Sequence, residues 1–198
     1  MTKIVGLTGG MGSGKTTIAN MFKDLGVSIY IADDEARIIT NQVETLNEIK
    51  LHFGNKMVVN NQLDRTLLAQ LVFQDASQLQ RLNSIIHPKV AAHFANWLKI
   101  HADERFIIKE SAILFETNSY LTCDYVITVT ASIEERIARV MQREAISEQE
   151  IKDRIRNQWT DEQRVELSDF VIENHDLITT RKQVFEVYQS ISSRLENP

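Results

Sequence analysis

Glycine is concentrated at one place in this chain of 198 residues: five of its seven glycines fall between positions 6 and 14, and none follows position 54. Glycine permits positive φ angles and close approach of the backbone to a ligand. The cluster therefore predicts that the main chain itself forms a binding surface there. The stretch GGMGSGKT at positions 9–16 fits G-x-x-x-x-G-K-[ST], the pattern of a loop that binds phosphate groups.

The sequence on either side of this loop supports a phosphate site. Residues 3–7 form a short apolar run typical of a strand buried on both faces, and residues 15–25 have a helical apolar spacing that ends at Gly26. Backbone N–H groups of such a loop and the positive end of the helix attract phosphate oxygens. We expect Lys15 to reach the β and γ phosphates of a nucleotide, and the Thr16 hydroxyl to complete the coordination of Mg²⁺.

Further apolar runs predict the rest of a parallel sheet. They are short, rich in Ile and Val, and occupy residues 27–31, 106–108, 125–129 and 170–172. Between the second and third strands, a mostly helical pattern without clear strands covers residues 33–40, 45–53, 64–73 and 77–100. The sequence therefore predicts an α/β protein with a three-layer P-loop NTPase fold, a parallel five-stranded sheet and a helical insertion.

Three capping boxes predict three helices in close succession. The pairs are Ser132 with Glu135, Ser147 with Glu150, and Thr160 with Gln163. In the first helix three arginines share one face and three apolar residues share another: Arg136, Arg139, Arg143 and Ile133, Ile137, Val140. An exposed basic face is often merely solvated. Beside a triphosphate it predicts a helical lid whose guanidinium groups hold the transferring phosphate while water is excluded.

Composition excludes several classes of protein. The chain has 22 Lys and Arg against 27 Asp and Glu, a net charge of -5, which gives no general footprint for nucleic acid. No apolar run approaches the roughly 20 residues that span a bilayer. Cys123 is the single cysteine, so no intramolecular disulfide forms, and the amino end lacks the pattern of a signal peptide. We expect a cytoplasmic protein without nucleic-acid or membrane partners, and the sequence leaves its oligomeric state open.

The remaining motifs favour small-molecule phosphotransfer among proteins with such a loop. A regulatory GTPase needs a downstream D-x-x-G and an N-K-x-D base reader, but no glycine follows Gly54, and Asn55-Lys56 continues with Met57-Val58. Motor and transport ATPases usually end an apolar strand with an acid, for which only Glu110 is a weak candidate. Two alternatives stay open: another small P-loop kinase, acting on a nucleoside monophosphate or similar alcohol, and a nucleotide-dependent binding or switch protein.

Four further residues are candidates for the site, each with a structural alternative. Asp33, at the end of the second predicted strand, either activates an acceptor hydroxyl or caps the next helix. Asn174 follows the last strand and either reads an adenine edge or forms a turn. His87-Pro88 interrupts a helical pattern, which predicts a turn carrying a ligand-facing or a structural imidazole. Glu116 ends an apolar stretch and is either a helix cap or a site residue.

The ordered set of these motifs resembles the dephospho-coenzyme A kinase family, whose members phosphorylate the ribose 3′-hydroxyl of dephospho-coenzyme A. The resemblance runs nearly end to end. It rests on IVGLTGGMGSGKTT at 4–17, ADDEAR at 32–37, LDR at 63–65, IIHP at 85–88, ILFE at 113–116, RVMQR at 139–143 and DFVIEN at 169–174.

The resemblance implies that the chain has three functional parts: a core, a subdomain and a lid. Residues 1–33, 101–138 and 159–198 would form the nucleotide-binding core, residues 34–100 a coenzyme-binding helical subdomain, and residues 139–158 a lid. It implies Asp33 as the base that accepts the 3′-hydroxyl proton, with Lys15, Arg139 and Arg143 as its catalytic partners. ATP would be bound by Gly10, Met11, Gly12, Ser13, Gly14, Lys15, Thr16, Thr17 and Asn174, and dephospho-coenzyme A by Asp33, Arg37, His87 and Glu116.

The chain departs from the family pattern at three places. Ile31-Ala32-Asp33 stands where D-A-D is common, so the first acid is missing. The segment SAILFE at 111–116 lacks the proline of V-P-L-L-F-E, and ENHD at 173–176 replaces D-N-x-G, which predicts a turn of different shape. None of these departures involves Lys15, Thr16 or Asp33.

Overall fold

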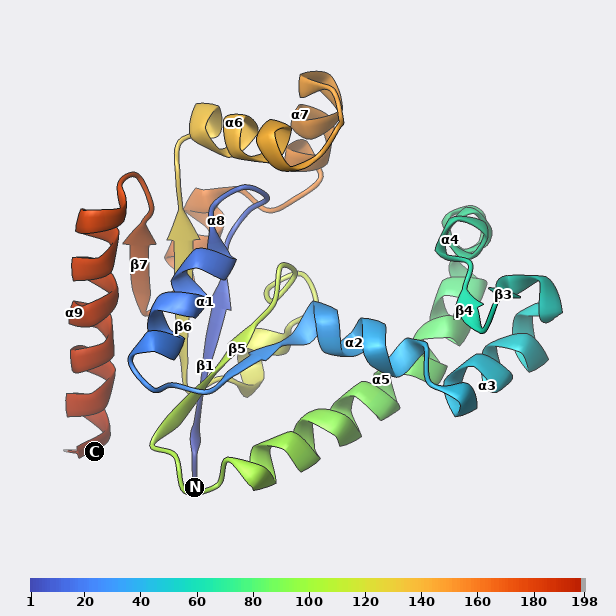
Figure 1. Ribbon diagram of the computed structural model, residues 1–198, viewed down its shortest axis with the longest axis horizontal. Helices are drawn as coiled ribbons and strands as arrows, with labels where there is room; N and C mark the ends of the chain where they lie inside the picture. Colours follow the sequence, from blue (N-terminus) through green and yellow to red (C-terminus); the bar gives the residue numbers. More distant parts are fainter. Residues whose placement is uncertain (197–198) are drawn as a thin grey trace. The chain divides into compact units, whose positions relative to one another are not determined.

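A computed structural model describes residues 1–196, and the side chains of these residues except 72–74 and 76. The chain forms two compact units. Met1–Ile31 and the chain from His101 onward make one, here called the sheet unit, and Ala32–Ile100 make the other, the helical unit. Both are drawn in Figure 1. None of the helices within the described residues combines the length and apolar character needed to cross a membrane.

The sheet unit is built on five parallel strands, as the sequence predicts. They are β1 (Lys3–Thr8), β2 (Ile29–Ile31), β5 (Phe106–Glu110), β6 (Tyr125–Thr130) and β7 (Phe170–Glu173), in the order β2-β5-β1-β6-β7. The central strand β1 pairs with β5 and β6, with Val5 opposite both Ile108 and Tyr125. Because all five strands are parallel, their carboxyl ends meet at one edge, where ligands bind in open α/β sheets.

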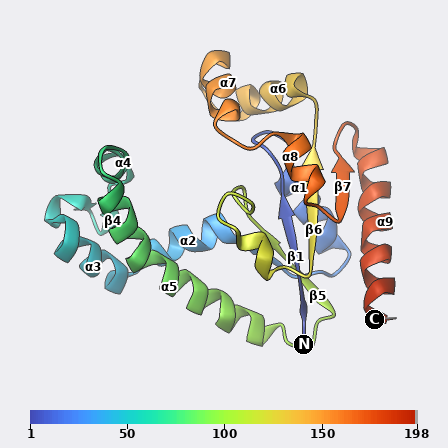
Figure 2. The ribbon, with the colours of Figure 1, turned by 180° about the vertical axis from the view of Figure 1, so that it is seen from behind.

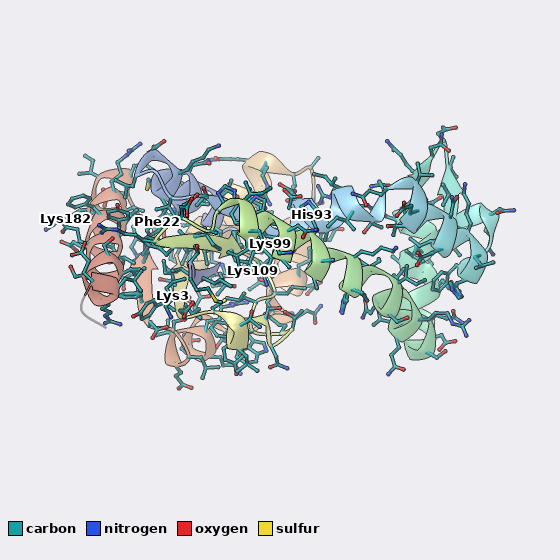
Figure 3. The ribbon with its side chains drawn as sticks, turned by 90° about the horizontal axis from the view of Figure 1, so that it is seen from below. Lys3, Phe22, His93, Lys99, Lys109 and Lys182 are labelled. Atoms are coloured by element: carbon teal, nitrogen blue, oxygen red, sulfur yellow. The ribbon has the colours of Figure 1, made fainter. Side chains whose placement is uncertain are left out.

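Helices cover both faces of this sheet, giving three layers. Helices α1 (Lys15–Asp24) and α9 (Leu177–Glu196) pack together on one face, and α8 (Asp161–Glu166) and the 3-10 helix η2 (Ser119–Thr122) cover the other (Figures 1 and 2). Phe22 of α1 is fully buried in the first of these layers, whereas Lys182 projects outward from α9 (Figure 3). The strands contribute fully buried Val5, Leu7, Ile108, Ile127 and Val129 to the same core.

The second predicted strand begins two residues later than its apolar run, because the end of α1 uses the first of these residues. Gly26 has a φ of 86°, its N–H donates to the Lys23 carbonyl, and the Val27 N–H donates to the Phe22 carbonyl. These two bonds satisfy carbonyls that a helix end otherwise leaves open. Val27 therefore closes the helix, and β2 starts at Ile29.

The three predicted capping boxes are confirmed. Ser132, Ser147 and Thr160 cap helices α6 (Ile133–Arg143), α7 (Glu148–Arg156) and α8, each accepting a bond from the backbone N–H three residues on. Figure 1 shows α6 and α7 beyond the carboxyl ends of β1 and β6, at the same end of the sheet as the glycine-rich loop. Local capping chemistry thus places two arginine-bearing helices beside the predicted phosphate site.

The helical unit contains α2 (Ala32–Thr40), α3 (Val43–Phe53), α4 (Arg65–Gln74), α5 (Ala76–Ile100) and the 3-10 helix η1 (Asn55–Met57). Its small core is an apolar cluster of Ile49, Phe53, Met57, Leu68, Leu82 and Ile85.

This unit also holds a short hairpin, so the expectation of no strands there is wrong. Strands β3 (Val58–Val59) and β4 (Gln62–Leu63) are antiparallel, and Asn60 and Asn61 between them have φ angles of 50° and 58°. Two consecutive positive φ angles suit a two-residue hairpin turn of type I′, which asparagine tolerates. Strands of two residues are too short to show the alternation that identifies a strand.

The predicted turn at His87-Pro88 is also wrong, because α5 continues through Pro88 as one helix of 25 residues. A proline inside a helix leaves the carbonyl four residues earlier without its N–H donor. Here that carbonyl belongs to Ser84, and Ser84, His87 and Pro88 are all exposed, so water can satisfy it. Leu82 and Ile85 of the same helix are buried in the apolar cluster and hold the helix in place.

Candidate active site

The glycine-rich loop joins β1 to α1 and lies against α6. Gly12 has a φ of 78°, and a Cβ built on it would stand 2.5 Å from the backbone oxygen of Arg136. Only glycine fits such a close approach of two backbones. Helix α1 then begins at Gly14 without a side-chain cap. The start of such a helix carries the positive end of its dipole and attracts an anion.

The side chain of Lys15 bends back over the loop. Its Nζ donates to the carbonyl oxygens of Gly9 at 2.9 Å and of Gly10 at 3.5 Å. A pocket of about 260 Å³ lies beside it and brings together several of the residues predicted for the nucleotide. It is lined by Gly12, Gly14, Lys15, Thr16, Thr17, Arg139, Val140 and Arg143.

The two predicted phosphate-binding arginines reach this pocket from α6. Arg139 donates to the carbonyl oxygens of Asn174 at 2.7 Å and of Ser13 at 3.3 Å. Arg143 is exposed and lies beside Glu144 at the end of the helix. Permanently charged guanidinium groups on one side of the pocket and an amine on the other are suited to a polyphosphate between them.

Arg136 does not share the exposed face with these two arginines, so that expectation is wrong. Arg136 is only 4% exposed. Its Nε donates to the Met11 carbonyl at 2.8 Å, and its Nη1 lies 3.3 Å from the carboxylate of Asp161. Burial lowers the pKa of Arg136, while the charge of Asp161 opposes this change. Ile133, expected on the apolar face, is 43% exposed. Arg136 therefore packs against the phosphate loop through Met11 and is not part of the pocket lining.

Other side chains of the sheet unit hold the tip of the loop. The Met11 N–H, predicted to contact ATP, donates here to Oε1 of Gln158 at 2.8 Å. Asp161 bridges Arg136 to the fully buried Arg164, whose Nη2 lies 3.3 Å from Glu116. Sequence patterns did not reveal Gln158, Asp161 or Arg164 as partners of the site, because no local spacing marks a contact between distant segments. Glu116 is thus part of an ion network, and its contact with substrate stays a prediction.

Asn174 lies at the end of β7 and is only 5% exposed. Its side-chain amide donates to the Ser13 carbonyl at 2.8 Å, and its Oδ1 accepts a bond from the Thr180 hydroxyl at 3.4 Å. The amide thus contacts the phosphate loop, and the predicted contact with adenine stays a prediction.

The remaining predicted residues lie in the helical unit. Helix α2 starts at Ala32, so Asp33 is inside its first turn and the alternative that it caps the helix is wrong. Asp33 is exposed, and among the described residues its carboxylate has no hydrogen-bond or ion-pair partner. It lines a pocket of about 460 Å³ with Ala36, Arg37, Thr40, Leu63, Arg65, Leu68, Leu82 and Ile86. His87 is exposed on α5 outside this lining.

Two guanidinium groups lie close to each other at this pocket. The pKa of Arg65 is lowered by partial burial and by the charge of Arg37. Arg37 itself is mostly exposed, and its nearest carboxylate, Asp34, is 3.8 Å away. Two neighbouring cations attract an anion, and the apolar residues beside them offer a surface for an uncharged chain.

Known proteins of similar sequence identify the family of this chain. The sequence profile of the family described as dephospho-CoA kinase matches residues 3–179. The chain belongs to the dephospho-CoA kinase family. It is 36% identical to a dephospho-CoA kinase of Bacteroides fragilis over 86% of this chain and 83% of that one. It is 35% identical to one of Chlorobaculum tepidum over 98% of this chain and 97% of the relative.

Solved structures agree with the fold. A dephospho-CoA kinase from Campylobacter jejuni covers 98% of both chains with a TM-score of 0.71 and 27% identity. The protein TT1252 from Thermus thermophilus covers 96% of this chain and 97% of its own, with a TM-score of 0.88 and 29% identity. A shikimate kinase from Acinetobacter baumannii, with a TM-score of 0.55 and 14% identity, shares the fold alone. The predicted α/β P-loop kinase fold is therefore confirmed.

The only cysteine of this dephospho-CoA kinase family member serves packing. Burial raises the pKa of the Cys123 thiol to about 11, and a Cβ built on Gly6 would stand 3.0 Å from its sulfur. The reactive thiolate is therefore scarce at mildly alkaline pH. We expect iodoacetamide to leave the native protein unlabelled for a time in which it fully labels the protein in urea, as measured by mass spectrometry. Equal labelling rates would contradict this buried environment.

Glu135 connects α6 to the segment after β7 and makes stability depend on pH. Its pKa falls from 4.5 to about 2, through hydrogen bonds with Ser132 first and then with His175. Because the folded state lowers this pKa, the stabilisation is complete above pH 4.5 and is lost as the pH falls toward 2. We expect Glu135→Gln, which can retain the capping box, to lower the melting temperature at neutral pH and to reduce its fall between these two pH values.

The control for this prediction is Glu134→Gln, which changes an exposed acid one residue away. Its melting temperature should follow the wild-type curve from neutral to acid pH. A Glu135→Gln curve that runs parallel to both would show that the carboxylate contributes nothing to the acid dependence.

Proposed function

We propose that this protein transfers the γ phosphate of ATP to the ribose 3′-hydroxyl of dephospho-coenzyme A, giving coenzyme A and ADP, the last step of coenzyme A biosynthesis in the cytoplasm. Membership of the dephospho-CoA kinase family and the names of the relatives above support this reaction. The single observation that carries it is the pocket in which Lys15, Arg139 and Arg143 surround the glycine-rich loop of a family member.

The nucleotide half of the reaction belongs to the sheet unit. The loop and the first turn of α1 would bind the phosphates through backbone N–H groups, and Lys15, Arg139 and Arg143 would hold the negative charge on the transferring group. Residues 139–158 would act as the lid that excludes water.

Thr16 fits a role as the protein ligand of Mg²⁺. It is exposed at the pocket, at the start of α1. Among the described residues, no group of three or more His, Cys, Asp or Glu side chains could hold a metal ion. Mg²⁺ needs no such group, because it keeps several waters and binds substrate phosphates. When bound, Mg²⁺ supplies positive charge to the triphosphate.

The acceptor half would use the helical unit as the coenzyme-binding subdomain, residues 34–100. Arg37 and Arg65 at its pocket suit the diphosphate of dephospho-coenzyme A, and the apolar lining suits its uncharged arm. The exposed carboxylate of Asp33 is suited to accept the proton of the attacking 3′-hydroxyl. His87 and Glu116 would be further contacts of the coenzyme.

An acceptor panel tests the proposed function. The purified protein is mixed with Mg-ATP and dephospho-coenzyme A, AMP or adenosine, and the release of ADP is measured for each acceptor. We expect rapid release with dephospho-coenzyme A alone. Faster release with AMP or adenosine would assign the chain to another small-molecule kinase activity. Nucleotide binding without release for any acceptor would favour a binding or switch protein.

A further inference from the structure

We propose that Asn174 is a positioning residue of the phosphate loop, acting on the bound triphosphate through the Ser13 peptide and so without regard to the base of the nucleotide. This inference rests on the proposed function, since it takes the loop as the site of a nucleoside triphosphate. It assigns to Asn174 a task different from the adenine contact that the family resemblance implies.

The side chain of Asn174 is held from two directions. Its Nδ2 donates to the Ser13 carbonyl at 2.8 Å. Its Oδ1 lies 3.4 Å from the hydroxyl of Thr180, a fully buried residue of α9, and this hydroxyl is shared between Oδ1 and the Glu173 carbonyl, also at 3.4 Å. The backbone is held as well, because the Asn174 N–H donates to the Thr130 carbonyl at 2.8 Å. The amide thus occupies one orientation, set by β6 and α9, and presents its donor to the loop.

The bond to Ser13 orients the next N–H group of the loop. In a trans peptide the carbonyl and the following N–H point in opposite directions, and none of the described peptide bonds is cis. Because the Ser13 carbonyl points to Asn174, the Gly14 N–H points away from Asn174. Gly14 lines the pocket beside Lys15, whereas Asn174 does not. Asn174 therefore orients the Gly14 N–H, a backbone donor of the kind that binds phosphate in such a loop.

The fit between loop and amide is close enough to make this orientation specific. Gly14 has a φ of 96°, and a Cβ built there would stand 2.0 Å from Nδ2 of Asn174. Arg139 completes the arrangement, since it donates to the same Ser13 carbonyl at 3.3 Å and to the Asn174 carbonyl at 2.7 Å. The loop, the end of β7 and α6 are thus joined at a single carbonyl oxygen.

Burial opposes direct base reading by the same side chain. Asn174 is only 5% exposed, and both ends of its amide are already bonded. A residue that acts through the loop affects the triphosphate of any nucleotide, whereas a base reader distinguishes ATP from GTP.

This difference defines the experiment. Dissociation constants of Mg-ATP, Mg-GTP and inorganic triphosphate are measured for the wild type and for Asn174→Asp, which keeps the shape but turns a donor into an acceptor facing the Ser13 carbonyl. We expect affinity for all three to fall by about tenfold or more, since the buried Ser13 carbonyl loses the nearer of its two donors and faces a carboxylate oxygen instead. The ratio of ATP to GTP affinity should not change.

Two further variants keep the test decisive. Thr180→Val removes the hydroxyl that orients the amide at nearly constant volume, and it should weaken all three ligands in the same pattern but by less. His175→Ala, an exposed neighbour outside the loop, should change none of them. Melting temperatures identify a variant that fails to fold. If Asn174→Asp fails to fold, the affinities of Thr180→Val decide the test.

Three results would overturn the inference. A loss confined to Mg-ATP would identify Asn174 as a base reader, and unchanged affinities in a folded Asn174→Asp protein would remove its role in positioning. If Asn174→Asp does not fold, unchanged affinities in a folded Thr180→Val protein would likewise show that Asn174 does not position the loop. A wild-type protein that binds none of the three ligands would instead contradict the proposed function itself.

Discussion

Lys15→Ala is expected to lower kcat/KM for phosphoryl transfer by about three orders of magnitude, the size of effect seen when a charged group that stabilises the transition state is removed. Lys15 lies at the pocket that Arg139 and Arg143 also line. Its Nζ bonds the carbonyl oxygens of Gly9 and Gly10, which belong to the glycine-rich loop itself. The melting temperature should therefore change little. Steady-state kinetics and a thermal melt on the same sample measure both quantities.

Lys23→Ala is the matched control for this variant, because Lys23 is an exposed lysine at the other end of α1. It should retain wild-type turnover and melting temperature. If Lys15→Ala lost thermal stability in proportion to its loss of activity, the lysine would be a structural residue and not a catalytic one.

We expect Asp33→Asn to lower kcat by about two to four orders of magnitude, because it removes the proposed general base, and to leave the affinity for Mg-ATP nearly unchanged. Asp33 is not among the residues that line the pocket beside the phosphate loop, so the variant removes no group of that pocket. Its exposed carboxylate has no partner among the described residues, so the fold loses little. Turnover at saturating acceptor and nucleotide binding by calorimetry separate the two effects.

Asp34→Asn controls for the loss of one negative charge in the first turn of α2. Asp34 is exposed and only 3.8 Å from Arg37, so its change removes a weak surface pair. It should leave kcat close to the wild-type value. Unchanged turnover in Asp33→Asn would remove Asp33 as the base.

Local signals in the sequence were sufficient to predict most strands and helix starts of the sheet unit. Buried parallel strands have short apolar runs, and helix starts have capping boxes, so the strands and the caps at Ser132, Ser147 and Thr160 could be predicted. The start of β2 could not be predicted correctly, because Val27 is apolar but its N–H completes the end of α1.

The contacts around the phosphate loop depend on long-range packing and were outside the reach of sequence patterns. Arg136 has the same helical spacing as Arg139 but is buried, because Met11 and Asp161 supply its partners. Asn174 follows a strand, where a ligand contact is expected, yet its amide bonds Ser13, a residue 161 positions earlier. Periodicity identifies a face of a helix, but it does not identify what packs against that face.

Identification of the product formed from Mg-ATP and dephospho-coenzyme A tests the central claim most directly. The reaction is followed by mass spectrometry and by ³¹P NMR, with Lys15→Ala as the blank. The account predicts a product heavier by one phosphate group, with a new phosphomonoester signal and the chromatographic position of coenzyme A, together with an equal amount of ADP. Consumption of ATP without this phosphomonoester, or a phosphate attached elsewhere on the acceptor, would contradict it.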